Sequence, residues 1–401
     1  MKPSLRILPP GAAQFAADPG APAIAMFAGD RGALQVATSA IGLGIDLRAD
    51  GESRIVASNS DLKALLEPLR ELAPALAARL EHYLQPVMAW RLRTRSLVLN
   101  RPVTMGILNL TEDSFSGDGV GTTIGAALVR AEELRASGAD IIDVGAESAR
   151  ADRPVLEEAA EAELVAKTVR SLAAEGHVVS TDTYKPLVAV AAVQSGAELV
   201  NDISGLTIGT GAAQAAAEAG AGYVLNYSYS VPKRRPDEPP EYTDIVNETV
   251  GWMEERLDRL EVHGLARETI AIDPGIAFGK SHDEDMQVLR RCGELRTFGQ
   301  PLLLAHSRKN FIGSLTGKPP AGRDLETHVA SALAYEQGFR IFRVHDPAGA
   351  RRALALAAAI SSGQPGDFGP DETSWPWRAG ASASHMTLQA PDKSAPAGQR
   401  W

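Results

Sequence analysis

The pattern of apolar and polar positions changes near residue 100. From about residue 103 to 360, short apolar runs alternate with stretches rich in Ala, Leu and Glu, and the alternation occurs eight times. Polar residues follow each apolar run, as expected where a buried parallel strand ends. Eight strand–helix units in roughly 260 residues predict an α/β fold, a (β/α)₈ TIM barrel. A doubly wound open sheet is the alternative, but eight regular units favour closure.

The predicted barrel strands are the eight apolar runs, each four to six residues long. They are Val103–Leu108, Ala139–Val144, His177–Thr181, Leu199–Ile203, Gly222–Leu225, Thr269–Ile272, Pro301–Ala305 and Arg340–Val344. Helices are expected between them, among others at Leu156–Ala174, Lys185–Ser195, Ile245–His263 and Leu325–Gln337. The last of these has apolar residues spaced for one buried face.

Residues 1–85 show a weaker pattern, which predicts a small α+β extension. Weakly alternating stretches occur at Ala23–Phe27, Leu34–Thr38 and Ile45–Arg48, and one amphipathic helix is expected from Leu62 to about Tyr83. Residues 92–99 alternate apolar and cationic side chains over a turn, so residues 86–101 are predicted to form a hairpin that leads into the barrel and plugs its bottom. The barrel is expected over residues 102–361. Residues 362–401 are rich in Gly, Pro, Ser and Ala and are predicted to be a disordered tail.

Composition narrows the class of protein. The chain of 401 residues is 44% hydrophobic and 22% charged, as expected of a globular protein. A net charge of −10 argues against nucleic-acid binding. No apolar run approaches the roughly 20 residues of a membrane span, and the N-terminus lacks the apolar core of a signal peptide, so a cytoplasmic location is expected. The single cysteine, Cys292, is assigned no chemistry.

Acids and amides end several middle strands, and a barrel brings such residues together at one mouth. Asp182, Asn201 and Asp273 are predicted to line a pocket for a flat heterocycle rich in N–H donors. A carboxylate can accept two parallel hydrogen bonds from an amino-amidine edge, which is why these residue types suit that ligand. The alternative for Asp182 and Asn201 is that they cap the following helices.

Cationic residues end other strands. Lys309, Arg343, His345 and Arg150 are predicted to form a rim for a phosphate or pyrophosphate, and Asn109 is placed to hold a Mg²⁺ ion bound to it. For Arg343 and His345 the alternative is a surface ion pair with Asp346.

The segment Asp273–Lys280 is glycine-rich but lacks the features of a nucleotide-binding loop. It lacks the Walker Lys-Ser/Thr pair and the G-x-G-x-x-G spacing. A tight turn that presents Asp273 and Phe278 is expected instead. The sequence also lacks a Cys/His cluster with zinc-ligand spacing and a nucleophilic serine elbow.

Seven segments, in order along the barrel, resemble the dihydropteroate synthase family of pterin-binding barrels. They are Met105–Gly119, Gly138–Arg150, Ser180–Pro186, Asn201–Gly205, Asp273–Lys280, Ser307–Gly313 and Arg343–Asp346. The resemblance covers essentially the whole predicted barrel, and the N-terminal region is faintly similar to the extension of some longer synthases.

The resemblance implies condensation of (7,8-dihydropterin-6-yl)methyl diphosphate with 4-aminobenzoate in folate biosynthesis, with release of pyrophosphate. It assigns Asp182, Asn201, Asp273 and Lys309 to the pterin, and Asn109, Arg343 and His345, with Mg²⁺, to the departing pyrophosphate. Phe278 and Ser307 would bind the arylamine, and the first two strand-end loops, which carry Ser116 and Arg150, would close over the site. A homodimer through Leu325–Gln337 and Ala348–Ile360 is also implied.

This chain departs from the family pattern at several positions. Ala146 and Ala149 replace a glycine and a threonine of the second loop, and Asn226-Tyr227-Ser228 replaces a Met-His-Met type of sequence. His306 precedes Ser307 where a small or apolar residue is common, and Glu112 replaces a frequent proline. These changes leave open a modified arylamine, such as the ribosylated aminobenzene of methanopterin synthesis, as the second substrate.

Two further classes of function remain as alternatives. A pterin-dependent methyltransferase that passes a methyl group to a corrinoid would share the barrel, but it would not need the Ser307 and Arg343 segments for pyrophosphate. A non-catalytic paralogue could keep the pterin pocket and lose the reaction. The presence of Asn109, Lys309, Arg343 and His345 favours an enzyme.

Overall fold

The computed structural model describes residues 4–8, 23–28, 31–47, 52–111, 119, 121–147, 155–229 and 240–362. Predictions that concern Glu112, Ser116, Ala149 and Arg150, and the tail beyond residue 362, lie outside the described residues. Within the described residues, no helix combines the length and apolar character of a membrane span.

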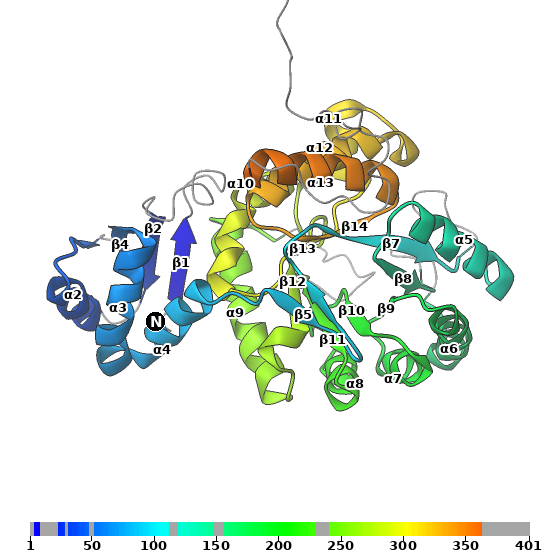
Figure 1. The fold of residues 1–401 in the computed structure, drawn as a ribbon, viewed down its shortest axis with the longest axis horizontal. Coiled ribbons are helices and arrows are strands. Elements are labelled where there is room, and N and C mark those ends of the chain that lie inside the picture. Colours follow the sequence, from blue (N-terminus) through cyan, green and yellow to red (C-terminus); the bar gives the residue numbers. More distant parts are fainter. Residues whose placement is uncertain are drawn as a thin grey trace, which may run out of the picture. The chain divides into compact units, whose positions relative to one another are not determined.

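Eight parallel strands form a closed α/β barrel, which confirms the predicted fold class (Figure 1). The strand order is β12-β11-β10-β9-β8-β7-β14-β13, and a parallel bridge between Ile272 and Leu302 joins the two ends of this order. The strands are β7 Val103–Asn109, β8 Ile141–Gly145, β9 Val179–Asp182, β10 Leu199–Asp202, β11 Gly222–Asn226, β12 Ile270–Asp273, β13 Leu303–Leu304 and β14 Ile341–Val344. Both ends of each strand lie within two residues of the ends of the predicted apolar run.

Helices follow the strands and surround the sheet (Figure 1). They are α5 Ile124–Ala136, α6 Glu158–Ala174, α7 Pro186–Ser195, α8 Gly211–Ala219, α9 Ile245–Val262, α10 His282–Arg291, α11 Asn310–Thr316, α12 Asp324–Glu336 and α13 Pro347–Ser362, with 3₁₀ turns η1 Arg267–Thr269, η2 Cys292–Phe298 and η3 Pro320–Gly322. Capping residues define where two of these helices begin. Ser281 and Glu284 form a capping box at the start of α10, and the Asp244 carboxylate accepts from two backbone N–H groups at the start of α9.

Two strands, β5 Ala89–Arg91 and β6 Ser96–Val98, pair as an antiparallel hairpin before the barrel. Trp90 and Leu92 of the hairpin pack with the buried starts of barrel strands, among them Ile141 and Leu199. The indole N–H of Trp90 donates to the carbonyl of Thr269 at 2.8 Å. The amino-terminal end of the barrel is therefore filled by apolar side chains, which leaves the carboxyl ends of the strands for polar groups.

The described residues of the N-terminal region form a four-stranded antiparallel sheet in the order β1-β2-β4-β3, with three helices. Its elements are β1 Ser4–Leu8, β2 Ala23–Ala28, α2 Arg31–Ala40, β3 Asp46–Leu47, β4 Glu52–Ala57, α3 Asn59–Leu72 and α4 Pro74–Leu84. The extension is thus α+β in content, as predicted.

Two predictions for this region were wrong. Leu34–Thr38 lies within helix α2, where Ala33, Leu34, Ala37 and Thr38 are buried at helical spacing. A window of five residues with mixed polarity fits both the two-residue period of a strand and the 3.6-residue period of a helix. In this segment the helical period is the correct one. The single helix expected from Leu62 to Tyr83 is two helices, α3 and α4, which separate at Ala73. The fixed φ of Pro74 and its missing N–H favour the first position of a new helix over the interior of an existing one.

Candidate active site

Five barrel strands carry a buried apolar residue inside the barrel and a polar residue two positions later. Because side chains alternate along a strand, the polar residue points to the same side, one layer nearer the carboxyl end. The pairs are Ile141 and Asp143, Leu199 and Asn201, Val224 and Asn226, Ala271 and Asp273, and Ile341 and Arg343. A polar layer therefore lies directly above the apolar layer that the hairpin closes.

An ion cluster occupies the centre of this polar layer. The Arg343 guanidinium donates from Nε to Asp143 Oδ2 and from Nη2 to Asp182 Oδ2, both at 2.6 Å. The Asn201 amide also donates to Asp143 Oδ2, at 3.1 Å. Asp143 is fully buried, so its charge depends on Arg343 for compensation. The cluster joins strands β8, β9, β10 and β14.

Burial is the largest influence on the pKa values of Asp182 and Arg343 in the cluster. Burial raises the pKa of Asp182 to about 7, although the neighbouring guanidinium opposes the shift and Asp143 adds to it. Burial alone would lower the pKa of Arg343, but Asp143 and Asp182 outweigh it and the net direction is upward. The Asp182 carboxyl can therefore change its protonation state near neutral pH, whereas Arg343 stays charged.

Two buried oxygens beside the cluster have no hydrogen-bond partner within the described part of the chain. They are Asp143 Oδ1 and Ser180 Oγ, on residues that are paired across strands β8 and β9. Buried polar atoms are almost always satisfied in folded proteins. Unused oxygens at this place suit a ligand that supplies N–H donors.

Asp273 and Asn226 lie in the same layer on adjacent strands, but their side chains bind backbone. Asp273 accepts from the N–H of Gly275 at 2.7 Å and from that of Ala305 at 2.8 Å. The Asn226 amide donates to the carbonyls of Ile203 and Tyr227 at 3.2 and 2.8 Å. Burial raises the pKa of Asp273, with Lys309 opposing. Both side chains therefore fix the strand ends, besides any contact with a ligand.

Lys309 and Phe278, predicted from segments far apart in sequence, lie together. The Lys309 ammonium lies 4.7 Å from the centre of the Phe278 ring and donates to the carbonyl of Ile276 at 2.6 Å. Burial lowers the pKa of Lys309 to about 8, against the attraction of Asp273. A cation over an aromatic face is a favourable contact, and this one places charge beside a flat apolar surface.

Ser307 and His345 also lie together. Ser307 Oγ is 2.8 Å from His345 Nδ1 and accepts from the backbone N–H of His345 at 3.2 Å. The surface ion pair considered as an alternative does not form for Arg343, which binds Asp143 and Asp182. Asp346 is instead bound by His328 at 3.0 Å.

Asn109 ends β7 level with Gly145, Asp182 and Asn201 across the sheet. A Cβ built on Gly145 would lie 3.7 Å from both Asn109 Oδ1 and Asp182 Oδ2. The two oxygens therefore border one space, which the glycine keeps open. The helix-capping alternative for Asp182 and Asn201 does not hold, because the N-cap residues of α7 and α8 are Lys185 and Thr210.

Two of the residues that depart from the family pattern, Tyr227 and His306, have buried side chains that contact other parts of the protein. Tyr227 is buried, its hydroxyl 3.2 Å from that of Tyr242, and the Lys280 ammonium lies 3.6 Å from the centre of its ring. His306 is fully buried and its Nε2 lies 2.9 Å from the carbonyl of Thr327 on α12. Burial lowers the pKa of His306 to about 4, so it is neutral at physiological pH. Its bonding to α12 directs His306 away from the mouth.

The sequence analysis did not choose Asp143 for the pocket, although it lies at the centre of the cluster. The signal was available, because Asp143 stands two positions after Ile141 in a fully buried strand. Glu147 was likewise not chosen as a site residue. It accepts from the Lys185 ammonium at 2.6 Å and from the Tyr184 hydroxyl at 2.7 Å, and Lys185 also binds Glu161. Those partners could not be read from spacing.

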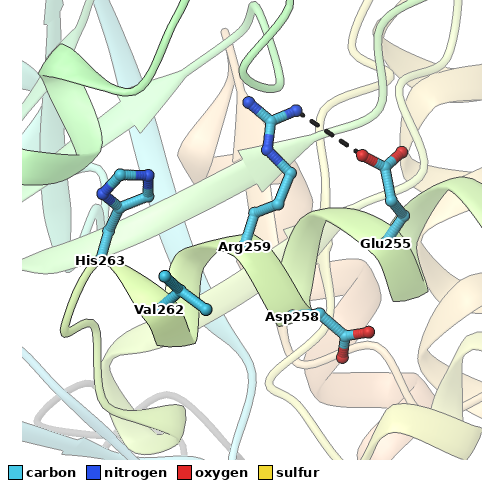
Figure 2. Close-up of a pocket in the computed structure, with 5 residues that line it drawn as sticks. All are labelled: Glu255, Asp258, Arg259, Val262 and His263. Atoms are coloured by element: carbon cyan, nitrogen blue, oxygen red, sulfur yellow. Dashed lines mark ion pairs between the residues drawn. The ribbon is translucent and has the colours of Figure 1, made fainter.

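A surface hollow elsewhere, shown in Figure 2, is lined by residues from the end of helix α9 and the residue after it. They are Glu255, Asp258, Arg259, Val262 and His263. This end of α9 leads towards the start of β12, so it belongs to the end of the barrel opposite the polar layer. An exposed ion pair between Arg259 and Glu255 at 3.7 Å is its main polar contact, and it carries no chemistry of the kind found at the mouth.

A closed (β/α)₈ barrel with acids, amides and a buried arginine at its mouth has the architecture of a barrel enzyme, and its polar layer fits the pterin pocket that the sequence resemblance implies. The model of the family described as "Pterin binding enzyme" matches residues 105–345, and the chain belongs to this family. It is 36% identical to the dihydropteroate synthase of Escherichia coli (strain K12) over 268 residues, which are 67% of this chain and 94% of that protein.

Solved structures of dihydropteroate synthases give the same result. A Yersinia pestis synthase determined with a sulfonamide drug complex superimposes with a TM-score of 0.65 at 34% identity, covering 69% of this chain and 100% of that one. A Thermus thermophilus synthase in complex with 4-aminobenzoate gives a TM-score of 0.60 at 34% identity, covering 68% of this chain and 99% of that one. This chain is thus a homologue of dihydropteroate synthases, which are transferases.

Removing the central guanidinium should destabilise the barrel. In an Arg343→Leu variant, Asp143 and Asp182 would be left without their cation, and we expect the free energy of unfolding to fall by about 3 kcal/mol or more. Urea denaturation would measure it, with Arg135→Leu as the control, because Arg135 pairs with Glu132 on the exposed face of α5. A change no larger than that of the control would show that the cluster is not withdrawn from water.

Proposed function

We propose that this chain condenses (7,8-dihydropterin-6-yl)methyl diphosphate with 4-aminobenzoate and releases pyrophosphate. The observation that carries the proposal is the Asp143–Arg343–Asp182 cluster, with Asn201 beside it, at the mouth of the barrel. Related synthases have been solved with 4-aminobenzoate and with 7,8-dihydropteroate. Those are the second substrate and the product of this reaction.

The pterin would lie in the polar layer. Its amino-amidine edge presents N–H donors, and Asp182 together with the unused oxygen of Asp143 can accept them. Asn201 can supply both a donor and an acceptor to the same ring. Asp273 holds the ends of β12 and β13 through the N–H groups of Gly275 and Ala305. Lys309 would contact a pterin oxygen or nitrogen on the side that faces Phe278.

In the reaction, the bond between the pterin methylene carbon and the diphosphate oxygen breaks, and a bond from that carbon to the arylamine nitrogen forms. The amine loses one proton and pyrophosphate leaves with the bonding electrons. Positive charge develops on the pterin methylene, and buried carboxylates nearby stabilise it electrostatically. Arg343 Nη1, which has no hydrogen bond among the described residues, can donate to the departing diphosphate, and His345 can do the same from a ring that Ser307 orients.

The arylamine would bind against Phe278, with the Lys309 ammonium above the ring plane. The Ser307 hydroxyl can donate to its carboxylate when His345 Nδ1 carries a proton and donates to Ser307 Oγ. Arg150, which lies outside the described residues, stays a prediction for this part of the site. The divergent Tyr227 and His306 are packed into the protein, so their identity gives no reason to reject 4-aminobenzoate.

We propose Mg²⁺ as the cofactor, and the donor set at the mouth fits it. Within the described residues no three His, Cys, Asp or Glu side chains converge on a metal site. Mg²⁺, however, is commonly held by one or two protein oxygens together with substrate phosphates and water. Asn109 Oδ1 would be such a ligand beside Asp182. When bound, Mg²⁺ would neutralise negative charge on the diphosphate.

We also propose a homodimer through helices α12 and α13. Large apolar side chains are more than half exposed on these neighbouring helices: Leu325, Val329 and Leu333 on α12, and Leu356 and Ile360 on α13. The α12 residues recur every four positions, which places them on one face. Figure 1 shows the two helices side by side on the outside of the barrel. An exposed apolar face of this kind suits an isologous interface.

The activity itself is the first test. With the dihydropterin diphosphate, Mg²⁺ and 4-aminobenzoate, the protein should release pyrophosphate, and Asp182→Asn should lower kcat by about 100-fold because the pocket loses a carboxylate. Asp258→Asn on the outer surface of α9 is the matched control and should behave like the unchanged protein. A panel of other arylamines, including a ribosylated aminobenzene, runs in parallel.

Turnover with another amine alone would identify a synthase with a different second substrate. Pterin binding by calorimetry without turnover on any amine would favour a paralogue that has lost the reaction. Tight binding of methyltetrahydrofolate would point to a methyltransferase. Omission of Mg²⁺, with excess chelator, should reduce turnover strongly if the cofactor assignment is right.

The pH dependence of kcat/KM for the pterin diphosphate should be bell-shaped. As pH falls through about 7, Asp182 becomes protonated and can no longer accept two hydrogen bonds, so the rate falls. As pH rises through about 8, Lys309 loses its charge and the rate falls again. Lys309→Arg should remove the alkaline limb, because arginine stays charged. An alkaline limb that persists in Lys309→Arg would assign it to another group.

The dimer is tested by sedimentation equilibrium at micromolar concentration. The unchanged protein should sediment as a dimer, and Leu333→Arg should sediment as a monomer, because it buries a charge in the apolar face. Val129→Arg on α5, where Val129 is 63% exposed, is the control and should leave the dimer intact. A monomeric unchanged protein would contradict the proposal.

A further inference from the structure

The turn after β12 contains three residues in the left-handed region of backbone conformation. Gly275, Ala277 and Gly279 have φ of 66°, 67° and 76°. No other residue fits at the two glycines. An added Cβ would lie 2.0 Å from the Tyr227 carbonyl oxygen at Gly275 and 2.3 Å from Tyr229 Cβ at Gly279. Ala277 is different, because its Cβ makes the left-handed conformation unfavourable in itself.

A buried carboxylate from the next helix meets this alanine. Asp285, in the first turn of α10, is fully buried, and its Oδ1 accepts from the N–H of Ala277 at 2.8 Å. Its Oδ2 has no hydrogen-bond partner among the described residues. Burying a carboxylate is unfavourable, and its one hydrogen bond goes to the residue whose conformation needs support.

The residues on both sides of Ala277 belong to the proposed site. The carbonyl of Ile276 accepts from the Lys309 ammonium at 2.6 Å, and the ring of Phe278 lies beneath the same ammonium. A rotation of the backbone at Ala277 would turn both groups. The position of Lys309 therefore depends on the conformation of Ala277.

The other ties of the turn do not replace this one. Lys280 donates to the carbonyls of Pro274 and Gly275, and Asp273 accepts from the N–H of Gly275, so both act on the first half of the turn. In the second half, the N–H of Phe278 donates to the carbonyl of Gly275 at 3.0 Å and the Tyr242 hydroxyl donates to that of Gly279 at 2.9 Å, and neither bond uses the Ala277 N–H. In the part of the chain that the structure describes, the hydrogen bond to Asp285 is the only one that the Ala277 N–H makes.

We propose that Asp285 is a positioning residue for the arylamine side of the site. By holding Ala277 in the left-handed conformation, it places Phe278 and Lys309 for the attack of the amine. The inference rests on the proposed function and deepens it, because it names a residue that acts through the turn and touches no substrate.

A double-mutant cycle between Asp285 and Ala277 tests the proposal. Glycine adopts the left-handed conformation without the penalty of a Cβ, so Ala277→Gly should make Asp285 dispensable. We expect Asp285→Ala to lower kcat/KM for the arylamine about tenfold in the natural background and less than about threefold in the Ala277→Gly background. Ala277→Gly alone should change kcat/KM less than about twofold.

Asp285→Asn separates the hydrogen bond from the charge. The amide keeps an oxygen that can accept from Ala277 and removes the negative charge that faces Lys280, Lys309 and His282. It should retain kcat/KM within about threefold of the unchanged protein. Equal losses for Asp285→Ala in both backgrounds, or a loss in Asp285→Asn as large as in Asp285→Ala, would overturn the proposal.

A second readout does not require turnover. Acetylation of Lys309, followed by mass spectrometry and referred to the exposed Lys318, should be faster in Asp285→Ala and return towards the natural rate when Ala277→Gly is added. If the unchanged protein shows no turnover, the proposed function fails and this labelling still tests the role of Asp285. Unchanged labelling in Asp285→Ala, with urea midpoints showing folded variants, would refute it.

Discussion

The contact on which the site and the barrel both depend is the Arg343 guanidinium between Asp143 and Asp182. The three residues come from β14, β8 and β9, and 161 to 200 positions separate the arginine from the two acids. None of the three charges could be withdrawn from water alone, because a buried ion without a partner is strongly unfavourable. The cluster can form only after β14, the last strand of the barrel, has paired with β7 beside β8 and β9, so it depends on contact between the first and last strands of the barrel.

The strands and the end at which the polar residues meet were predictable, because both follow from short-range patterns. An apolar run followed by polar residues marks a buried strand and its carboxyl end, as in Val103–Asn109. The failures also have local causes. Leu34–Thr38 is too short to separate the two periods, and a helix drawn through Pro74 ignored its missing N–H.

The partners of the site residues were not predictable, because they depend on distances between elements. Asp273 was expected to face a ligand, yet both its oxygens accept from backbone N–H groups. Arg343 was expected at the rim, yet it lies among acids. Sequence indicates which side chains reach the mouth. It does not indicate which of them satisfy one another before a ligand arrives.

The divergent positions show how the site tolerates change. The Tyr227 hydroxyl lies 3.2 Å from that of Tyr242, and His306 Nε2 lies 2.9 Å from the Thr327 carbonyl of α12, so each contact comes from an element outside the polar layer. Ala277, which is not one of those divergent positions, takes a conformation that suits glycine, and a carboxylate from α10 supports it. In each case the side chain or backbone is met by a partner behind the site, so the charged centre is not required to move. Divergence around the pocket is therefore compatible with an unchanged reaction, provided that the supporting partner is present.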